Sequence, residues 1–123
     1  MAADHATLGI VGGSGFYEID GLTNVRSLQI DTPFGPTSDA IVLGELDGVS
    51  VAFISRHGLG HRHTPSEVPY RANVWALASL GVSSLVSVSA VGSLKLEVAP
   101  LHMLIPDQLI DRTTGVRATT FFG

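Results

Sequence analysis

The chain has 123 residues, of which 45% are hydrophobic and 15% charged, with a formal net charge of −4 at pH 7. This apolar content excludes an intrinsically disordered chain, and the negative charge argues against non-specific binding to nucleic acid or membranes. The absence of cysteine excludes disulfides and thiolate chemistry. We expect residues 1–123 to be the N-terminal part of a single domain. Because no secretory signal or membrane-spanning run is visible, we also expect a soluble cytoplasmic protein. So low a charged fraction also suggests that further protein covers part of the surface.

Five short runs along the chain predict β-strands. Most are apolar and are bounded by glycine, proline or other turn residues, which is typical of buried strands. The expected strands are residues 7–11, 25–30 (the weakest), 40–46, 49–55 and 84–89. Between the third and the fourth lies Asp47-Gly48, the strongest short hairpin signal, so we expect an antiparallel pair there. The proline-rich residues 31–38 predict a loop.

One helix is expected, over residues 69–80. Pro69 suits its first turn and Gly81 ends it. With the strands on either side, this helix predicts a β-α-β unit containing a parallel pair. We expect Trp75 in the core, and Asn73 either reaching a ligand or bracing the neighbouring loop. The buried face is expected to carry Tyr70, Val74, Leu77 and Ala78.

The end of the chain carries weaker signals. Residues 101–110 form an apolar run interrupted by Pro106, and residues 111–123 are polar with two adjacent phenylalanines near the end. Nothing there resembles a capping helix. We therefore expect the chain to be a fragment, or the product of a shortened reading frame.

Three of the expected strands end in a polar, glycine-bearing turn. Residues 12–15 (GGSG) follow the first strand, Arg56 and His57 follow the fourth, and Ser89 ends the fifth. Glycines let backbone amides approach an anion, serine adds a hydroxyl, and arginine offers a planar donor set that suits phosphate. Because open α/β sheets hold ligands at the carboxyl ends of their strands, the three turns predict anion binding.

Each turn also has an ordinary structural explanation. The glycine turn could be a simple strand-to-loop connection, Arg56-His57 a surface pair, and the hydroxyls of Ser87, Ser89 and Ser93 could be satisfied within a strand. A dinucleotide-binding site is disfavoured, because Glu18 stands where its fingerprint needs glycine.

A histidine cluster raises the question of a metal. His57, His61 and His63 have the spacing His-x3-His-x-His, with His102 as a possible fourth ligand. No carboxylate is interleaved before Glu67. We expect no metal here, and the histidines to make loop contacts or donate to an anion.

Taken in order along the chain, these motifs resemble a known family. They are similar to those of the S-methyl-5′-thioadenosine phosphorylases, within the trimeric purine nucleoside phosphorylase family, from about Leu8 to Gly123. The segments that carry the resemblance are residues 12–16 (GGSGF), 32–35 (TPFG), 56–58 (RHG), 69–77 (PYRANVWAL), 89–94 (SAVGSL), 107–108 (DQ) and 111–114 (DRTT).

The resemblance implies an α/β fold with a mixed, partly barrel-like sheet flanked by helices, incomplete here, and assembly as a trimer or sometimes a hexamer. It implies phosphorolysis of S-methyl-5′-thioadenosine to adenine and 5-methylthioribose 1-phosphate, with inorganic phosphate as co-substrate and no cofactor. Val91 and Gly92 would lie near the nucleoside. The residues implied in phosphate binding are Ser14, Arg56, His57, Ser89 and Ala90.

The chain departs from this family in length. Members are more than twice as long, and the donor that protonates the leaving purine is expected beyond Gly123. We therefore expect weak or no phosphorolysis from the chain alone. A broader purine nucleoside or methylthioinosine phosphorylase stays open, as does a truncated, non-catalytic product that pairs with full-length subunits.

Overall fold

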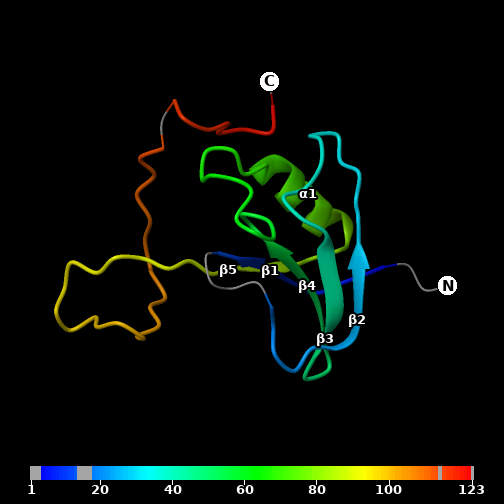
Figure 1. Cartoon of the computed structure of the whole chain (residues 1–123), viewed down its shortest axis with the longest axis horizontal. Coiled ribbons are helices and arrows are strands. Elements are labelled where there is room, and N and C mark those ends of the chain that lie inside the picture. The colour runs from blue at the N-terminus through cyan, green and yellow to red at the C-terminus, as the bar shows by residue number, and fades with distance from the viewer. Residues whose placement is uncertain (1–3, 14–17, 114, 123) are drawn as a thin grey trace. The chain divides into compact units, whose positions relative to one another are not determined.

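A computed structural model describes residues 4–13, 18–113 and 115–122 of the chain (Figure 1). Its internal contacts divide it into two compact units, Met1–Ala90 and Val91–Gly123. We describe each unit by itself. The expectation that residues 1–123 are part of one phosphorylase domain stays a prediction.

The first unit is built on one five-stranded sheet with the strand order β2-β3-β4-β1-β5. β1 pairs in parallel with both β4 and β5, whereas β3 pairs antiparallel with β2 and β4. The sheet is therefore mixed, as expected, and all five predicted strands are confirmed. Their bounds are β1 Leu8–Gly12, β2 Thr23–Leu28, β3 Ile41–Leu46, β4 Val49–Ser55 and β5 Ser84–Ser87.

The predicted hairpin joins β3 to β4. Asp47 and Gly48 both have positive φ angles, 49° and 78°, and Leu46 pairs with Val49 across the turn. Positive φ at both central positions is the geometry of the tight turns that match the twist of paired strands. The predicted β-α-β unit joins β4 to β5 through the helix. Its two strands are parallel but not neighbours, because β1 lies between them.

Helix α1 spans Tyr70–Ser79, and Gly81, with a φ of 82°, follows its end as predicted. The predicted buried face is right for Leu77 and wrong for Val74 and Ala78, which are exposed. The expectation that Trp75 lies in the core is wrong as well. The side chains that α1 buries are Ala72, Asn73, Ala76 and Leu77, whereas Val74 is 41% and Trp75 37% exposed. The two alanines have side chains small enough for the helix backbone to lie close to the sheet, and this turns the larger residues outward.

The core lies on both faces of the sheet, because side chains alternate between faces along a strand. Ala76 and Leu77 of α1 pack on one face with a group from the sheet that includes Val11, Ile41 and Ile54. On the other face Ile10, Val51 and Phe53 form a smaller cluster. Apolar residues on both faces of β1 and β4 thus hold the middle of the sheet in place.

The second unit, in its described residues 91–113 and 115–122, contains turns but neither helix nor strand. A backbone bond from Val98 to the carbonyl of Lys95 closes one such turn. Long apolar side chains, Leu94 and Leu101 among them, are fully exposed. In neither unit do the described residues include a helix with the length and apolar character needed to cross a membrane.

Candidate anion-binding site

The carboxyl ends of β4, β1 and β5 meet at one edge of the sheet (Figure 1). Past the strand ends the parallel pairing continues on both sides of β1. The backbone N–H of Arg56 donates to the carbonyl of Gly12, and that of Val88 to the carbonyl of Val11, each at 2.9 Å. The turns that follow β4 and β5 therefore flank the end of β1.

The side chain of Arg56 connects the two outer turns. Its Nη1 donates to Oγ of Ser89 at 2.8 Å. Arg56 is half-buried and Ser89 exposed, so a guanidinium with restricted freedom is accessible to a dissolved anion. Beside this bond and the one that Nε makes to His57, the guanidinium has three further N–H donors, so it is the group at the strand ends best suited to bind an anion.

Gly13, at the end of β1, makes this approach possible. A Cβ atom at this position would lie 2.5 Å from the carbonyl oxygen of Val88 and 2.8 Å from Nη2 of Arg56. No other residue type fits there without displacing the backbone of the strand next to it. At Gly13 the side-chain group in close contact is therefore the guanidinium of Arg56. That the glycines of residues 12–15 let backbone amides approach an anion stays a prediction.

His57 holds Arg56 from the other side. The His57 side chain is buried, and its Nδ1 lies 2.8 Å from the carbonyl oxygen of His63, which can only accept, so Nδ1 carries a proton. In the neutral ring Nε2 is then an acceptor, and Nε of Arg56 donates to it at 3.4 Å. Through this contact His57 restricts the orientation of the Arg56 side chain.

Two of the clustered histidines, His57 and His61, lie in contact. The rings of His57 and His61 stack in parallel with their centroids 4.3 Å apart. A stacked pair does not direct both ring nitrogens at one point. Within the described part of the chain, no group of three metal-ligating side chains comes together.

The structure shows less about the other predicted site residues. Ser14 lies outside the described residues. Ala90 follows Ser89 at the end of the first unit and is exposed. Val91 and Gly92 belong to the second unit, and their role beside the nucleoside stays a prediction.

Sequence reasoning missed Ser38, which is 1% exposed. Its backbone N–H donates to Oδ1 of Asn73 at 2.9 Å, and Nδ2 of Asn73 donates to its Oγ at 3.0 Å. Of the two roles open for Asn73, bracing the loop is the one observed. No local pattern could have identified Ser38, because its partner is 35 residues away.

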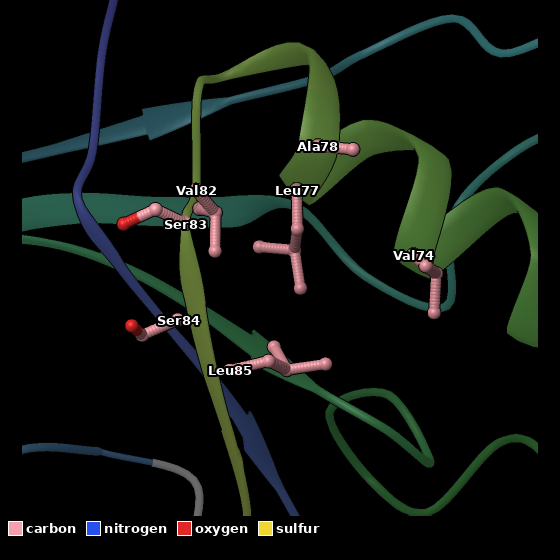
Figure 2. A pocket seen from close by; sticks show the side chains of 7 residues that line it. All are labelled: Val74, Leu77, Ala78, Val82, Ser83, Ser84 and Leu85. Atoms are coloured by element: carbon pink, nitrogen blue, oxygen red, sulfur yellow. The ribbon is translucent and has the colours of Figure 1, made fainter.

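An apolar groove lies apart from this site, between the end of α1 and the start of β5 (Figure 2). In Figure 2 Leu77, Val82 and Leu85 extend into it. Its volume is about 140 Å³, and it lies at the end of β5 away from Ser89. Its lining contains Ser83 and Ser84 but no cationic side chain, and its walls are mostly hydrocarbon, so it is poorly suited to an anion.

The loop between His57 and α1 contains a carboxylate with a lowered pKa. The backbone N–H and then the hydroxyl of Thr64 donate to Glu67, and both bonds hold its pKa below the ordinary value.

We expect Thr64→Val, which removes only the hydroxyl, to move the Glu67 pKa part of the way back. Carboxyl chemical shifts followed against pH would measure this, and an unchanged pKa would contradict the contact. The pKa of Glu67 is lower in the folded chain than in the unfolded chain. Its two hydrogen bonds to Thr64 therefore stabilise the folded turn at higher pH, and this stabilisation is lost as the pH falls through the folded-state pKa of Glu67.

The chain is similar in sequence to a family of known enzymes. The family model described as the phosphorylase superfamily matches residues 7–123. S-methyl-5′-thioadenosine phosphorylases of Geobacter sulfurreducens and Chloroflexus aurantiacus are each 56% identical to it, over 116 and 117 residues. The alignments cover 94% and 95% of this chain and 41% of each relative. The chain thus spans about two fifths of the length of the curated relatives it matches.

Solved structures show the same likeness. A methylthioadenosine phosphorylase from an Antarctic soil metagenomic library has a TM-score of 0.90 and 61% identity, covering 98% of this chain and 42% of that one. The methylthioadenosine phosphorylase of Schistosoma mansoni in complex with tubercidin has a TM-score of 0.72 and 44% identity, covering 77% and 34%. These findings confirm the expected fold class, and the chain belongs to the phosphorylase superfamily.

Proposed function

We propose that this chain provides the phosphate-binding part of an S-methyl-5′-thioadenosine phosphorylase. The reaction would convert S-methyl-5′-thioadenosine and phosphate into adenine and 5-methylthioribose 1-phosphate, in purine and methionine salvage. The observation that carries the proposal is the Arg56 guanidinium, held between Ser89 and His57 where three parallel strands end. The names of the relatives support the choice of substrate.

The chemistry asks for a fixed anion-binding group. As the bond from ribose to purine breaks, the ribosyl carbon gains positive charge, and a phosphate dianion held beneath the sugar stabilises that charge and then attacks the carbon. Donors already in position, such as Arg56 and the hydroxyl of Ser89, lower the entropic cost of bringing phosphate and nucleoside together. In this proposal Ser14 and Ala90 complete the phosphate contacts.

The wider expectations belong to the same proposal. Inorganic phosphate is the co-substrate and no cofactor takes part. The full-length form is a homotrimer in the cytoplasm, and Val91 and Gly92 lie near the nucleoside. Each of these follows from the family resemblance.

The test is adenine release from S-methyl-5′-thioadenosine by the 123-residue chain, in phosphate and in sulfate of equal ionic strength. We expect weak or no release, and any release to require phosphate and to yield 5-methylthioribose 1-phosphate, because the resemblance places the donor to the purine beyond Gly123. Release at the same rate in sulfate would mean hydrolysis and would contradict phosphorolysis. Robust phosphate-dependent release would contradict the expectation that the chain alone is weak.

Phosphate binding gives the same proposal a second test that needs no turnover. Titration calorimetry with inorganic phosphate should show one site per chain. Binding that Arg56→Ala leaves unchanged would locate the anion elsewhere.

A further inference from the structure

Arg56 and His57 are carried by one tight turn. The N–H of Gly58 donates to the carbonyl of Ser55 at 3.2 Å, which closes a four-residue turn with Arg56 and His57 at its centre. Gly58 has a φ of 73°, a conformation that favours glycine. The direction of the guanidinium therefore depends on what keeps this turn closed.

The carbonyl that closes the turn has a second donor. Oγ of Ser38 donates to the oxygen of Ser55 at 2.7 Å, and both residues are buried, at 1% and 6% exposure. A carbonyl oxygen has two lone pairs, so the hydroxyl adds to the Gly58 bond without replacing it. In a buried place such a bond is not exchanged for one to water.

Ser38 is itself fixed by the helix. The amide of Asn73, 3% exposed on α1, accepts from the N–H of Ser38 and donates to its Oγ. Because this oxygen accepts from Asn73, its own proton is directed to the carbonyl of Ser55. Two hydrogen bonds thus select the orientation of the hydroxyl.

Ser38 also packs against the other end of the turn. A Cβ on Gly58 would lie 2.8 Å from the carbonyl oxygen of Ser38, so the two backbones are in close contact there. The same oxygen accepts a long bond from Nη2 of Arg62, at 3.4 Å. Ser38 therefore contacts both the first and the last residue of the turn.

We propose that Ser38 and Asn73 are positioning residues for the anion site: they transmit the rigidity of α1 to the turn that presents Arg56 and His57. They act through the carbonyl of Ser55. The part of this inference that concerns phosphate rests on the proposed function, whereas the part that concerns the turn does not. The test has one measurement for each part.

The first measurement is amide hydrogen exchange in the chain without ligand. Ser38→Ala and Asn73→Ala should each speed exchange at Gly58 about fivefold, as expected for loss of a bond worth roughly 1 kcal/mol. The amide of Phe53, in the middle of β4, should be unchanged. The matched control is Ser79→Ala, which removes a hydroxyl that donates to the carbonyl of Ala76 at 2.8 Å on the same helix. Unchanged exchange at Gly58 in both variants would overturn the proposal.

The second measurement is the dissociation constant for inorganic phosphate. Ser38→Ala should raise it about five- to tenfold, and Ser79→Ala should not. In an Arg56→Ala background the same substitution should have almost no further effect, because a positioning residue has nothing left to position. A merely structural role would give equal losses in both backgrounds, and that result would overturn the positioning role.

The two measurements separate this inference from the proposed function. Faster Gly58 exchange in the Ser38 and Asn73 variants of a chain that binds no phosphate would support the positioning of the turn by these residues and contradict the phosphate function. Phosphate binding that needs Arg56 but not Ser38 would support the function and overturn the inference. Should Ser38→Ala fail to fold, Asn73→Ala answers the same questions, because alanine suits a helix.

Discussion

Arg56→Ala is expected to raise the dissociation constant for phosphate about 100-fold. Hydrogen bonds to a charged group contribute roughly 1.5–3 kcal/mol, and the upper end corresponds to about two orders of magnitude. The guanidinium is already held by Ser89 and His57, so little of its freedom remains to be lost when phosphate binds. Titration calorimetry on the full 123-residue chain measures the change directly.

Two further variants separate geometry from net charge. Arg26→Ala removes the same charge from β2, where Arg26 pairs with Asp4 at 2.7 Å, and should change phosphate binding by less than about twofold. Arg56→Lys keeps the charge but loses the planar fork, and an intermediate loss is expected. Equal losses for the Arg26 and Arg56 variants would mean that general electrostatic attraction, not a site, binds the anion.

Gly13→Ala is expected to damage both the fold and the site. The new methyl group would lie 2.5 Å from the carbonyl oxygen of Val88, a backbone atom directly after β5 in a residue whose N–H is bonded to Val11. Overpacking of this kind typically costs about 1–3 kcal/mol of unfolding free energy. Because Arg56 is the second obstructed group, phosphate affinity should also fall, by at least roughly tenfold if one charge-assisted bond is lost. Urea denaturation and calorimetry measure the two effects.

The double variant Gly13→Ala/Arg56→Ala identifies which contact matters. It removes the guanidinium and leaves the carbonyl of Val88 in place, so the loss of stability should persist. If the double variant were as stable as Arg56→Ala alone, the clash with the backbone would not be the cause.

Much of the fold could be predicted because its signals are local. Asp47-Gly48 specifies the hairpin through two positive φ angles, and Gly81 specifies the end of α1 in the same way. The order of strands is not local, because β1 inserts between β4 and β5, and nothing in its own residues says so. The buried face of α1 was predicted correctly only at Leu77, because other apolar positions were favoured over Ala72 and Ala76.

The site could be predicted in part, for the same reason. Arg56, His57 and Ser89 each follow a strand, and parallel strands bring such residues to one edge. That His57 orients Arg56 depends on the carbonyl of His63, a backbone atom that no side-chain motif reveals. Ser38 acts through a partner 35 residues away, which only the folded chain brings close.

The place of β1 between β4 and β5 also bears on the order in which this unit can fold. The β3–β4 hairpin is local, whereas β1 pairs with residues 43 positions away in β4 (Leu8 with Val51) and 76 away in β5 (Leu8 with Ser84). Pairings so distant in sequence form slowly, because a long loop must close first. Arg56 can meet Ser89 only after the last of them, so phosphate should bind only a chain whose sheet is complete, and should stabilise that state alone.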